Sequence, residues 1–283
     1  MGKYVYILNG KVLEDYSSII GEKLINNLGE EHEVELIYEK DSEFYLKFKN
    51  SDKEYALNPK YYTNLKMELK SNLSIKDIVE KRKIEFLCHF TNIKNLERIL
   101  KEGLITREFC DGTGLSCVND VKRYDYTNAI CTSISFPNYK MLYLLTLNNP
   151  DNKWVIIKLD STVLWELNCG FFYTNAANSK EFNDRHSDDY KTVESFEKMF
   201  YSELLYKSQL QKKIYRSDLG IDDFYTTDPQ AEVLIFENIN KKYIREILYS
   251  DSDDKLFFEK KFKEFKHIVN YDFFKYRNDF KHW

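Results

Sequence analysis

The stretch Asp228-Pro-Gln-Ala-Glu-Val-Leu-Ile235 decides how the fold of this chain is interpreted. Its Asp-Pro pair is typical of a turn, and the apolar, β-branched run behind it indicates a buried strand. Side chains two positions apart on a strand point to the same face, so Gln230 and Glu232 are expected to point together into a cleft at the mouth of that strand. The plainer alternative is an exposed glutamate that begins an edge strand.

Composition limits the classes of protein that need to be considered. The chain has 283 residues, of which 43% are hydrophobic and 16% aromatic, so it can form one large domain or a catalytic domain with a small partner. A net charge of −4 argues against coating duplex nucleic acid by bulk electrostatics, although a local basic groove stays open. There is no signal peptide, and no apolar run approaches the roughly 18 residues that span a bilayer. A cytoplasmic protein is therefore expected.

Cysteine and histidine usage argues against disulfides and metal sites. The five cysteines are odd in number, widely spaced and without a Cys-x-x-Cys pair, which suits reduced thiols in a cytosol. The five histidines include none paired with another His or Cys at zinc-ligand spacing. We therefore expect no metal.

The N-terminal part, residues 1–72, is predicted to be a small β-rich domain. Strands are expected at 4–8, 33–38, 43–48 and 54–57, and tight polar turns between the later ones predict an antiparallel meander or a small barrel. A docking or stabilising module is one interpretation of this domain, and a module that binds nucleic acid or a protein partner is the other.

The remainder, residues 73–283, mixes helices with strands and predicts an α+β fold. Ser74-Ile-Lys-Asp77 has the form of a capping box and begins a helix. An apolar strand over 84–90 carries His89 near its end, and the helix that follows is stopped by Gly103. A strand is expected over 129–136, and a helical pattern rich in lysine and aromatic residues over 255–283.

These elements supply the groups that transfer of ADP-ribose from NAD requires. A polar group must hold a ribose, a strand must bond the carboxamide, an aromatic ring must lie on the pyridinium, and a carboxylate must stabilise the cationic transition state. Candidates occur in this order: His89, the Thr132–Ser135 strand with Ser133 and Ser135, Phe136 with Tyr139, and Glu232. Taken singly, the histidine could be structural and the strand half-exposed. Their joint occurrence ahead of Gln-x-Glu favours the enzyme.

Four blocks carry a resemblance to a known family. The segments 88–104, 129–142, 172–177 and 226–234 resemble the DarT family, toxins that ADP-ribosylate nucleic-acid bases. The resemblance spans roughly residues 73–250 and leaves the first seventy residues outside. It implies an ADP-ribosyltransferase fold, in which split, mostly antiparallel β-sheets surround an NAD cleft, with NAD as the substrate.

Residue roles follow from the resemblance where the motifs match. Glu232 would be the catalytic glutamate. Arg123 would assist deprotonation of the base and contact the NAD phosphates, with Arg107 as the alternative. The NAD-binding residues would be His89, Phe90, Thr91 and Leu104, in addition to Arg123, Ser133, Ser135, Phe136 and Tyr139. Gln230 and Asp228, in the loop before the glutamate, would bind the acceptor.

The acceptor and the partners are expectations of the same kind. Single-stranded DNA is the preferred acceptor, with RNA or a protein side chain as alternatives, and a non-enzymatic relative of this fold is a further rival. Lys213, with the cations and aromatic residues near it, could follow a phosphate backbone and stack a base, or could be plain surface. The resemblance also implies a toxin–antitoxin or phage-defence system, with a macrodomain hydrolase or an occluding protein as the antitoxin.

Overall fold

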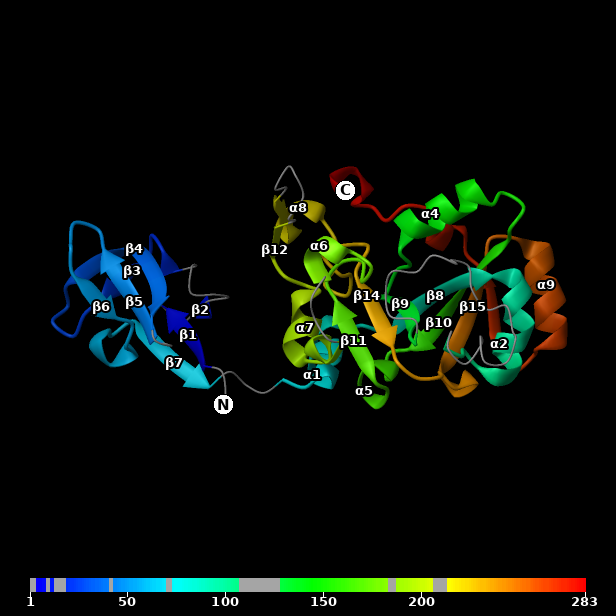
Figure 1. Ribbon diagram of the computed structural model, residues 1–283, viewed down its shortest axis with the longest axis horizontal. Coiled ribbons are helices and arrows are strands. Elements are labelled where there is room, and N and C mark those ends of the chain that lie inside the picture. Colours follow the sequence, from blue (N-terminus) through cyan, green and yellow to red (C-terminus); the bar gives the residue numbers. More distant parts are fainter. Residues whose placement is uncertain are drawn as a thin grey trace. The chain divides into compact units, whose positions relative to one another are not determined.

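The computed structural model divides the chain into two compact units, residues 1–72 and residues 73–283 (Figure 1). The structure describes residues 4–8, 11–12, 19–40, 43–69, 73–106, 128–182, 187–205 and 213–283. Within these ranges, no helix has both the length and the apolar character that crossing a membrane requires.

The N-terminal unit is built from two small sheets. The strands β3 (Lys23–Ile25), β4 (Glu31–Lys40), β5 (Glu43–Phe48) and β6 (Glu54–Ala56) form a four-stranded antiparallel sheet in that order. The predicted meander is confirmed in β4, β5 and β6. A second sheet has the order β2 (Lys11–Val12), β1 (Tyr4–Leu8) and β7 (Leu65–Leu69). The unit has a core of its own, which includes Leu24, Val34, Leu46, Phe48 and Tyr62.

The C-terminal unit is organised around one seven-stranded sheet. Its strands are β8 (Phe86–Asn92), β9 (Ile130–Ile134), β10 (Trp154–Asp160), β11 (Cys169–Phe172), β14 (Glu232–Ile235), β15 (Ile244–Tyr249) and β16 (Lys266–Val269). Their order is β11-β14-β9-β8-β10-β15-β16, and every pair is antiparallel except β15 and β16. The α+β class and the mostly antiparallel pairing are confirmed.

A short ladder joins the two halves of this sheet. The strands β8 and β9 pair through only two residue pairs, Leu87 with Ile134 and Cys88 with Ser133. By contrast, β8 and β10 pair over seven positions. The expected split of the sheet therefore takes the form of a narrow junction between β11-β14-β9 on one side and β8-β10-β15-β16 on the other.

Helices and a small hairpin surround the sheet. They are α1 (Ile75–Arg82), α2 (Leu96–Glu102), α4 (Tyr139–Asn148), α5 (Val163–Glu166), α6 (Ser179–Phe182), α7 (Val193–Lys198), α8 (Arg216–Leu219), α9 (Ser252–Lys261) and the hairpin of β12 (Glu203–Leu205) with β13 (Lys213–Tyr215). The predicted capping box at Ser74 and Asp77 is present at the start of α1. Gly103 ends α2 with φ +91°, and a Cβ there would lie 2.2 Å from the Ile239 carbonyl oxygen, so only glycine fits.

The two faces of the sheet are covered differently. One face carries the main hydrophobic core, to which α1, α2, α5, α7 and α9 contribute. The other face carries two separate clusters, one with Phe172, Tyr190 and Leu234 and one with Cys88, Trp154 and Leu248. The boundary between the two clusters falls at the narrow junction of β8 and β9.

The helical pattern predicted over residues 255–283 is wrong beyond Lys261. The chain leaves α9 and forms β16, which pairs in parallel with β15. Tertiary contacts override the helical pattern here, because the buried His267 ring bonds both the Tyr249 hydroxyl at 2.8 Å and the Phe262 carbonyl at 2.9 Å. Of the aromatic residues in this tail, Phe273 packs against the core, whereas Phe280 stays 52% exposed.

Candidate active site

Glu232 is the first residue of β14, an interior strand between β11 and β9. Its side chain is only 4% exposed, so the alternative of an exposed glutamate on an edge strand is wrong. On β14, Val233 pairs with Thr132, and the Thr132 hydroxyl donates to the Val233 carbonyl at 3.0 Å. One step further along this register, Glu232 lies level with Ser133, at the narrow junction of the sheet.

Two groups from the loop after β11 hold the Glu232 carboxylate. The main-chain N–H of Ala176 donates to Oε2 at 2.9 Å, and the Asn175 amide donates to Oε1 at 3.3 Å. Both donors belong to the 172–177 block, which carried part of the family resemblance but to which no role was assigned. A buried carboxylate needs such partners, because burying an unpaired charge is costly. The carboxylate is therefore held in one orientation.

His89 lies on the other side of the junction from Glu232. Its strand, β8, is separated from β14 by β9 alone. The His89 Nδ1 lies 2.8 Å from the Cys131 carbonyl oxygen, where the β8–β9 ladder has ended. A carbonyl only accepts, so Nδ1 carries the proton and donates it, which fixes the orientation of Nε2.

The turn between β9 and α4 gathers three buried polar atoms with no hydrogen-bond partner in the described part of the chain. They are Ser135 Oγ, Asn138 Nδ2 and the Tyr139 hydroxyl. Ser135 also has φ +60°, a conformation that costs a non-glycine residue energy. Buried polar groups are almost always satisfied, so such a cluster, with a strained residue in it, is typical of a ligand site. Burial, followed by the nearby Asp279 carboxylate, raises the pKa of Tyr139 above its ordinary range.

Phe136, expected to lie against the pyridinium, is held among other aromatic rings. It stacks on Phe273 with ring centres 5.3 Å apart and planes at 21°, and Tyr225 and Tyr139 meet it at steep angles. One face of the Phe136 ring is therefore covered by Phe273.

The other predicted NAD-binding residues differ in what surrounds them. Thr91 is buried, and its hydroxyl accepts from the Asn95 amide at 3.1 Å. Phe90 alternates with His89 along β8, so it points to the opposite face, where its ring meets Trp154 edge-on.

Leu104 and Ser133 are also buried. Leu104 belongs to the main core and exchanges main-chain hydrogen bonds with Ile239 at 2.9 and 2.8 Å. Ser133 lies in the short ladder opposite Cys88. The structure thus brings Ser133 beside Glu232 and places Leu104 within the hydrophobic core.

Residues 222–231, here called the acceptor loop, lead into β14. The strand begins at Glu232, so Gln230 lies in the preceding turn, and the expectation that both side chains follow strand alternation is wrong. The cause is Asp228, which is fully buried: its Oδ1 accepts from the Gln230 N–H at 2.7 Å and its carbonyl from the Ala231 N–H at 3.1 Å. Asp228, expected to bind the acceptor, shapes the turn that presents Gln230.

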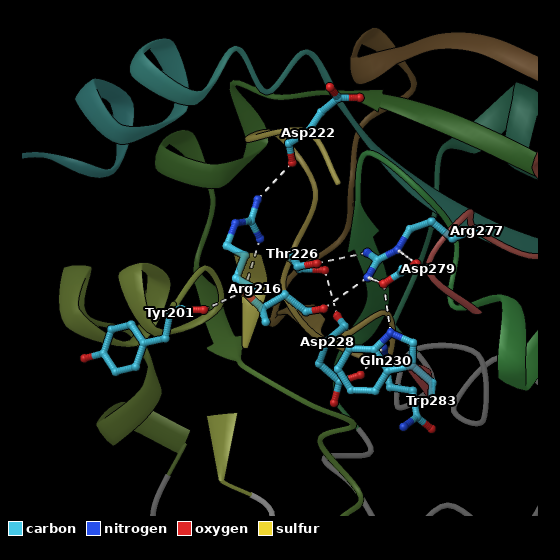
Figure 2. Close-up of polar contacts among 10 residues, drawn as sticks. Tyr201, Arg216, Asp222, Thr226, Asp228, Gln230, Arg277, Asp279 and Trp283 are labelled. Carbon is cyan, nitrogen blue, oxygen red and sulfur yellow. Dashed lines mark hydrogen bonds and ion pairs between the residues drawn. The ribbon is translucent and has the colours of Figure 1, made fainter. Parts of the chain in front are cut away.

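Figure 2 shows a buried network that holds the acceptor loop from the C-terminal tail. Arg277 donates from Nε and Nη2 to the two Asp279 oxygens, each at 2.7 Å. It also donates to the carbonyls of Thr226 at 2.9 Å and Thr227 at 3.1 Å. The Trp283 indole donates to Asp279 at 2.8 Å. Sequence reasoning missed this network, because nothing in the local pattern links residue 277 to residue 226.

Arg216 holds the same loop from the other side (Figure 2). Its guanidinium donates to the Thr227 hydroxyl at 3.1 Å and to the Asp222 carbonyl at 2.8 Å, and that hydroxyl in turn donates to the Tyr201 carbonyl. Burial, together with the nearby Arg82 charge, lowers the pKa of Arg216 to about 10. Its guanidinium hydrogen bonds are thus made within the protein.

The remaining candidates are less informative. Lys213 is exposed on β13, where its ammonium pairs with the Glu203 carboxylate at 2.6 Å. Arg123 and Arg107 lie outside the described residues. Among the residues that the structure describes, no group of three or more His, Cys, Asp or Glu side chains could hold a metal ion.

Comparison with known proteins identifies the family of the chain. A family model described as "ssDNA thymidine ADP-ribosyltransferase, DarT" matches residues 88–275, more than half of the chain. The chain thus belongs to the class of ADP-ribosyltransferases. Within that class, the chain belongs to the DarT family. No curated protein matches the chain significantly.

Solved structures of the same kind are similar to this chain. Thermosipho africanus DarTG in complex with ADP-ribose is 17% identical, with a TM-score of 0.48 over 69% of this chain and 52% of that one. Thermus sp. 2.9 DarT in complex with carba-NAD+ is 15% identical, with a TM-score of 0.46 over 68% and 99%. The Thermus protein in complex with ADP-ribosylated ssDNA is 14% identical, with a TM-score of 0.45 over 68% and 97%. The chain matches about half the length of the Thermosipho DarTG chain.

Proposed function

We propose that this chain transfers ADP-ribose from NAD to a thymidine base of single-stranded DNA, with Glu232 as the catalytic carboxylate. The observation that carries the proposal is the position of Glu232. It is a buried carboxylate at the mouth of an interior strand, and it accepts hydrogen bonds from Ala176 and Asn175. The neighbouring strand β9 leads into the turn whose three buried polar groups have no partner among the residues that the structure describes.

The reaction needs electrostatic stabilisation of positive charge at one carbon, the ribose C1′ of NAD. The bond from the ribose C1′ to the nicotinamide nitrogen breaks, and nicotinamide leaves with the bonding electron pair. The ribose C1′ then carries positive charge until a nucleophilic atom of the base bonds to it and the base gives up a proton. A carboxylate held in advance beside that carbon stabilises the charge without having to reorganise. Glu232 fits this role because its two hydrogen bonds fix it.

NAD binding is proposed for the residues around the β9–α4 turn and for His89. Ser135 Oγ, Asn138 Nδ2 and the Tyr139 hydroxyl would find partners in the polar groups of NAD. The His89 ring, fixed through Nδ1 by the Cys131 carbonyl, would present Nε2 to a ribose hydroxyl. Phe136, which is half-buried, would meet the nicotinamide ring.

The acceptor is proposed to enter over the acceptor loop. Gln230 is half-buried and lies two residues before Glu232, so its polar side chain is proposed to meet the base. Arg123 is proposed, from the family resemblance, to assist loss of the proton from the base. Lys213 would follow the backbone of the nucleic acid by exchanging its Glu203 partner for a phosphate.

The test is incubation with labelled NAD and matched single-stranded oligonucleotides. We expect label on a thymidine-containing DNA strand and none on the same strand with every thymidine replaced by cytidine. RNA of matched sequence forms the third arm. Label on RNA alone would transfer the proposal to an RNA acceptor, and label on none of the three would refute base modification.

A cognate antitoxin is the proposed partner, because an uncontrolled enzyme of this kind would modify the DNA of its own cell. It would be a macrodomain hydrolase that removes the ADP-ribose or a protein that covers the site. Since the proposed acceptor is intracellular, we propose action in the cytoplasm. The N-terminal unit, with its separate core, is proposed to act as an independent docking or binding module.

A further inference from the structure

The C-terminal tail reaches the acceptor loop through residues outside the family match. The match ends at residue 275, whereas the network of Figure 2 is formed by Arg277, Asp279 and Trp283. Arg277 is 4% exposed and Asp279 is fully buried, so two opposite charges are withdrawn from water in one place. A buried pair of this kind contributes little net stability, so its effect on the position of neighbouring groups matters more.

What the pair holds is main chain. The two oxygens of Asp279 accept from Nε and Nη2 and so orient the guanidinium. In this orientation Nη1 donates to the Thr226 carbonyl, and Nη2 also donates to the Thr227 carbonyl. The planar fork of arginine makes these bonds in a fixed geometry, and lysine cannot reproduce it. Two consecutive peptide units of the acceptor loop are therefore fixed from one side chain.

From these peptide units, two hydrogen bonds lead to Gln230. The Thr226 hydroxyl donates to the Asp228 carbonyl at 2.8 Å, and the Asp228 carboxylate accepts from the Gln230 N–H at 2.7 Å. Glu232 has separate support, because it is held by Ala176 and Asn175 and its strand is paired on both sides. Loss of the network would therefore displace Gln230 more than Glu232.

We propose that Arg277, oriented by Asp279, is a positioning residue that fixes the acceptor loop so that Gln230 meets the incoming base. The inference rests on the proposed function, because it takes Gln230 as the acceptor contact. It adds to that function a role for the tail, in which residues 277–283 set the efficiency of transfer without touching either substrate.

The experiment compares two quantities in the full chain: kcat for transfer to a thymidine-containing oligonucleotide, and the Kd for NAD measured by titration calorimetry. The Arg277→Lys variant keeps the charge and removes the fork. We expect its transfer kcat to fall about a hundredfold, as for a loop displaced by about 1 Å. We expect its Kd for NAD to stay within about twofold of the parent value, since Arg277 donates to Asp279 and to the carbonyls of Thr226 and Thr227, and to none of the proposed NAD-binding side chains.

Arg245→Lys is the matched control. The Arg245 guanidinium donates to the Glu85 carbonyl at 2.7 Å on an exposed part of the surface, so the same exchange is made without touching the acceptor loop. Its transfer kcat and its Kd for NAD should equal those of the parent. If Arg277→Lys fails to fold, Trp283→Phe replaces it, because that change removes the indole donor to Asp279 and keeps an aromatic ring.

The outcomes separate the two levels of the proposal. A parent chain that labels no oligonucleotide refutes the proposed function. If the parent labels DNA and the Arg277→Lys variant transfers with the same kcat, the positioning role is overturned. Equal losses of transfer and of NAD affinity would also overturn it, because they show that the tail supports the whole site and not the acceptor loop.

Discussion

The main-chain N–H of Ala176 donates a hydrogen bond of 2.9 Å to the carboxylate of Glu232, across 56 residues of sequence. The donor lies in the loop after β11 and the acceptor at the start of β14, and the two strands are neighbours in the sheet. The orientation of the carboxylate is thus set by a loop on the adjacent strand, and the contribution of that loop can be measured separately from that of the glutamate.

Replacing Asn175 by Ala tests the second donor to this carboxylate. The change removes the 3.3 Å bond to Oε1 and leaves the Ala176 bond in place. Hydrogen bonds to charged groups contribute about 1.5–3 kcal/mol, and this one is long, so transfer should fall roughly tenfold. Labelled-NAD transfer measures the effect. Activity equal to the parent would show that the Asn175 bond is not needed to orient the carboxylate.

Replacing Glu232 by Gln tests the charge itself. Glutamine keeps the shape and can still accept from Ala176, but it cannot oppose the positive charge at the ribose carbon. Transfer should fall about a hundredfold or more. The melting temperature controls for folding and should change little. A variant as active, and as toxic on expression, as the parent would remove Glu232 from the mechanism.

Two substitutions at His89 separate its structural bond from its proposed contact with NAD. Asparagine places an amide N–H near the position of Nδ1, so His89→Asn should keep the bond to the Cys131 carbonyl and the stability of the parent. It has no equivalent of Nε2, and its Kd for NAD should rise about tenfold or more. His89→Ala should lose both stability and affinity. Parent-like NAD affinity in His89→Asn would contradict a contact through Nε2.

Ser135 should show a trade between stability and substrate binding. Its left-handed φ of +60° suits glycine, and its buried hydroxyl has no partner among the described residues. Ser135→Gly should therefore raise the free energy of unfolding by about 1 kcal/mol while weakening NAD binding. Ser135→Ala, which keeps the strain and loses the hydroxyl, is the control for NAD affinity. Denaturant unfolding and calorimetry measure the two effects, and unchanged affinity in both variants would exclude Ser135 from the site.

Acid should weaken the tail network in a defined direction. Burial alone would raise the pKa of Asp279, but the hydrogen bonds and the charge of Arg277 outweigh it and lower that pKa. A carboxyl with a lowered pKa in the folded state contributes stability above its unfolded pKa of about 3.9 and loses it as the pH falls through the folded value. Asp279→Asn should flatten this part of a stability curve measured between about pH 2 and 6. If the free energy of unfolding of Asp279→Asn depends on acid pH as in the parent, the contribution of Asp279 to acid sensitivity is contradicted.

The local elements could be predicted because their causes are local. The capping box at Ser74 and Asp77 involves residues three apart, and the stop at Gly103 depends on one glycine. Glu232 could be placed at a strand entrance because a turn and an apolar run adjoin it.

The rest depends on contacts between distant segments. Gln230 lies in a turn and not in the expected strand because its N–H donates to the Asp228 carboxylate. Part of the predicted C-terminal helix is the strand β16 because its main chain pairs with the edge of β15. The link from Arg277 to Thr226 joins residues 51 apart, and no periodicity in the sequence announces it. The sequence also could not predict the distances between side chains at the junction of the sheet.

The late strand β16 also has a practical consequence. It covers the outer side of β15, whose residues 247–249 are buried. A chain shortened after α9 would expose that side as a row of unpaired N–H and C=O groups beside apolar side chains, which is a template for intermolecular pairing. Truncated versions made for crystallisation or expression are therefore expected to aggregate unless residues 266–269 are retained.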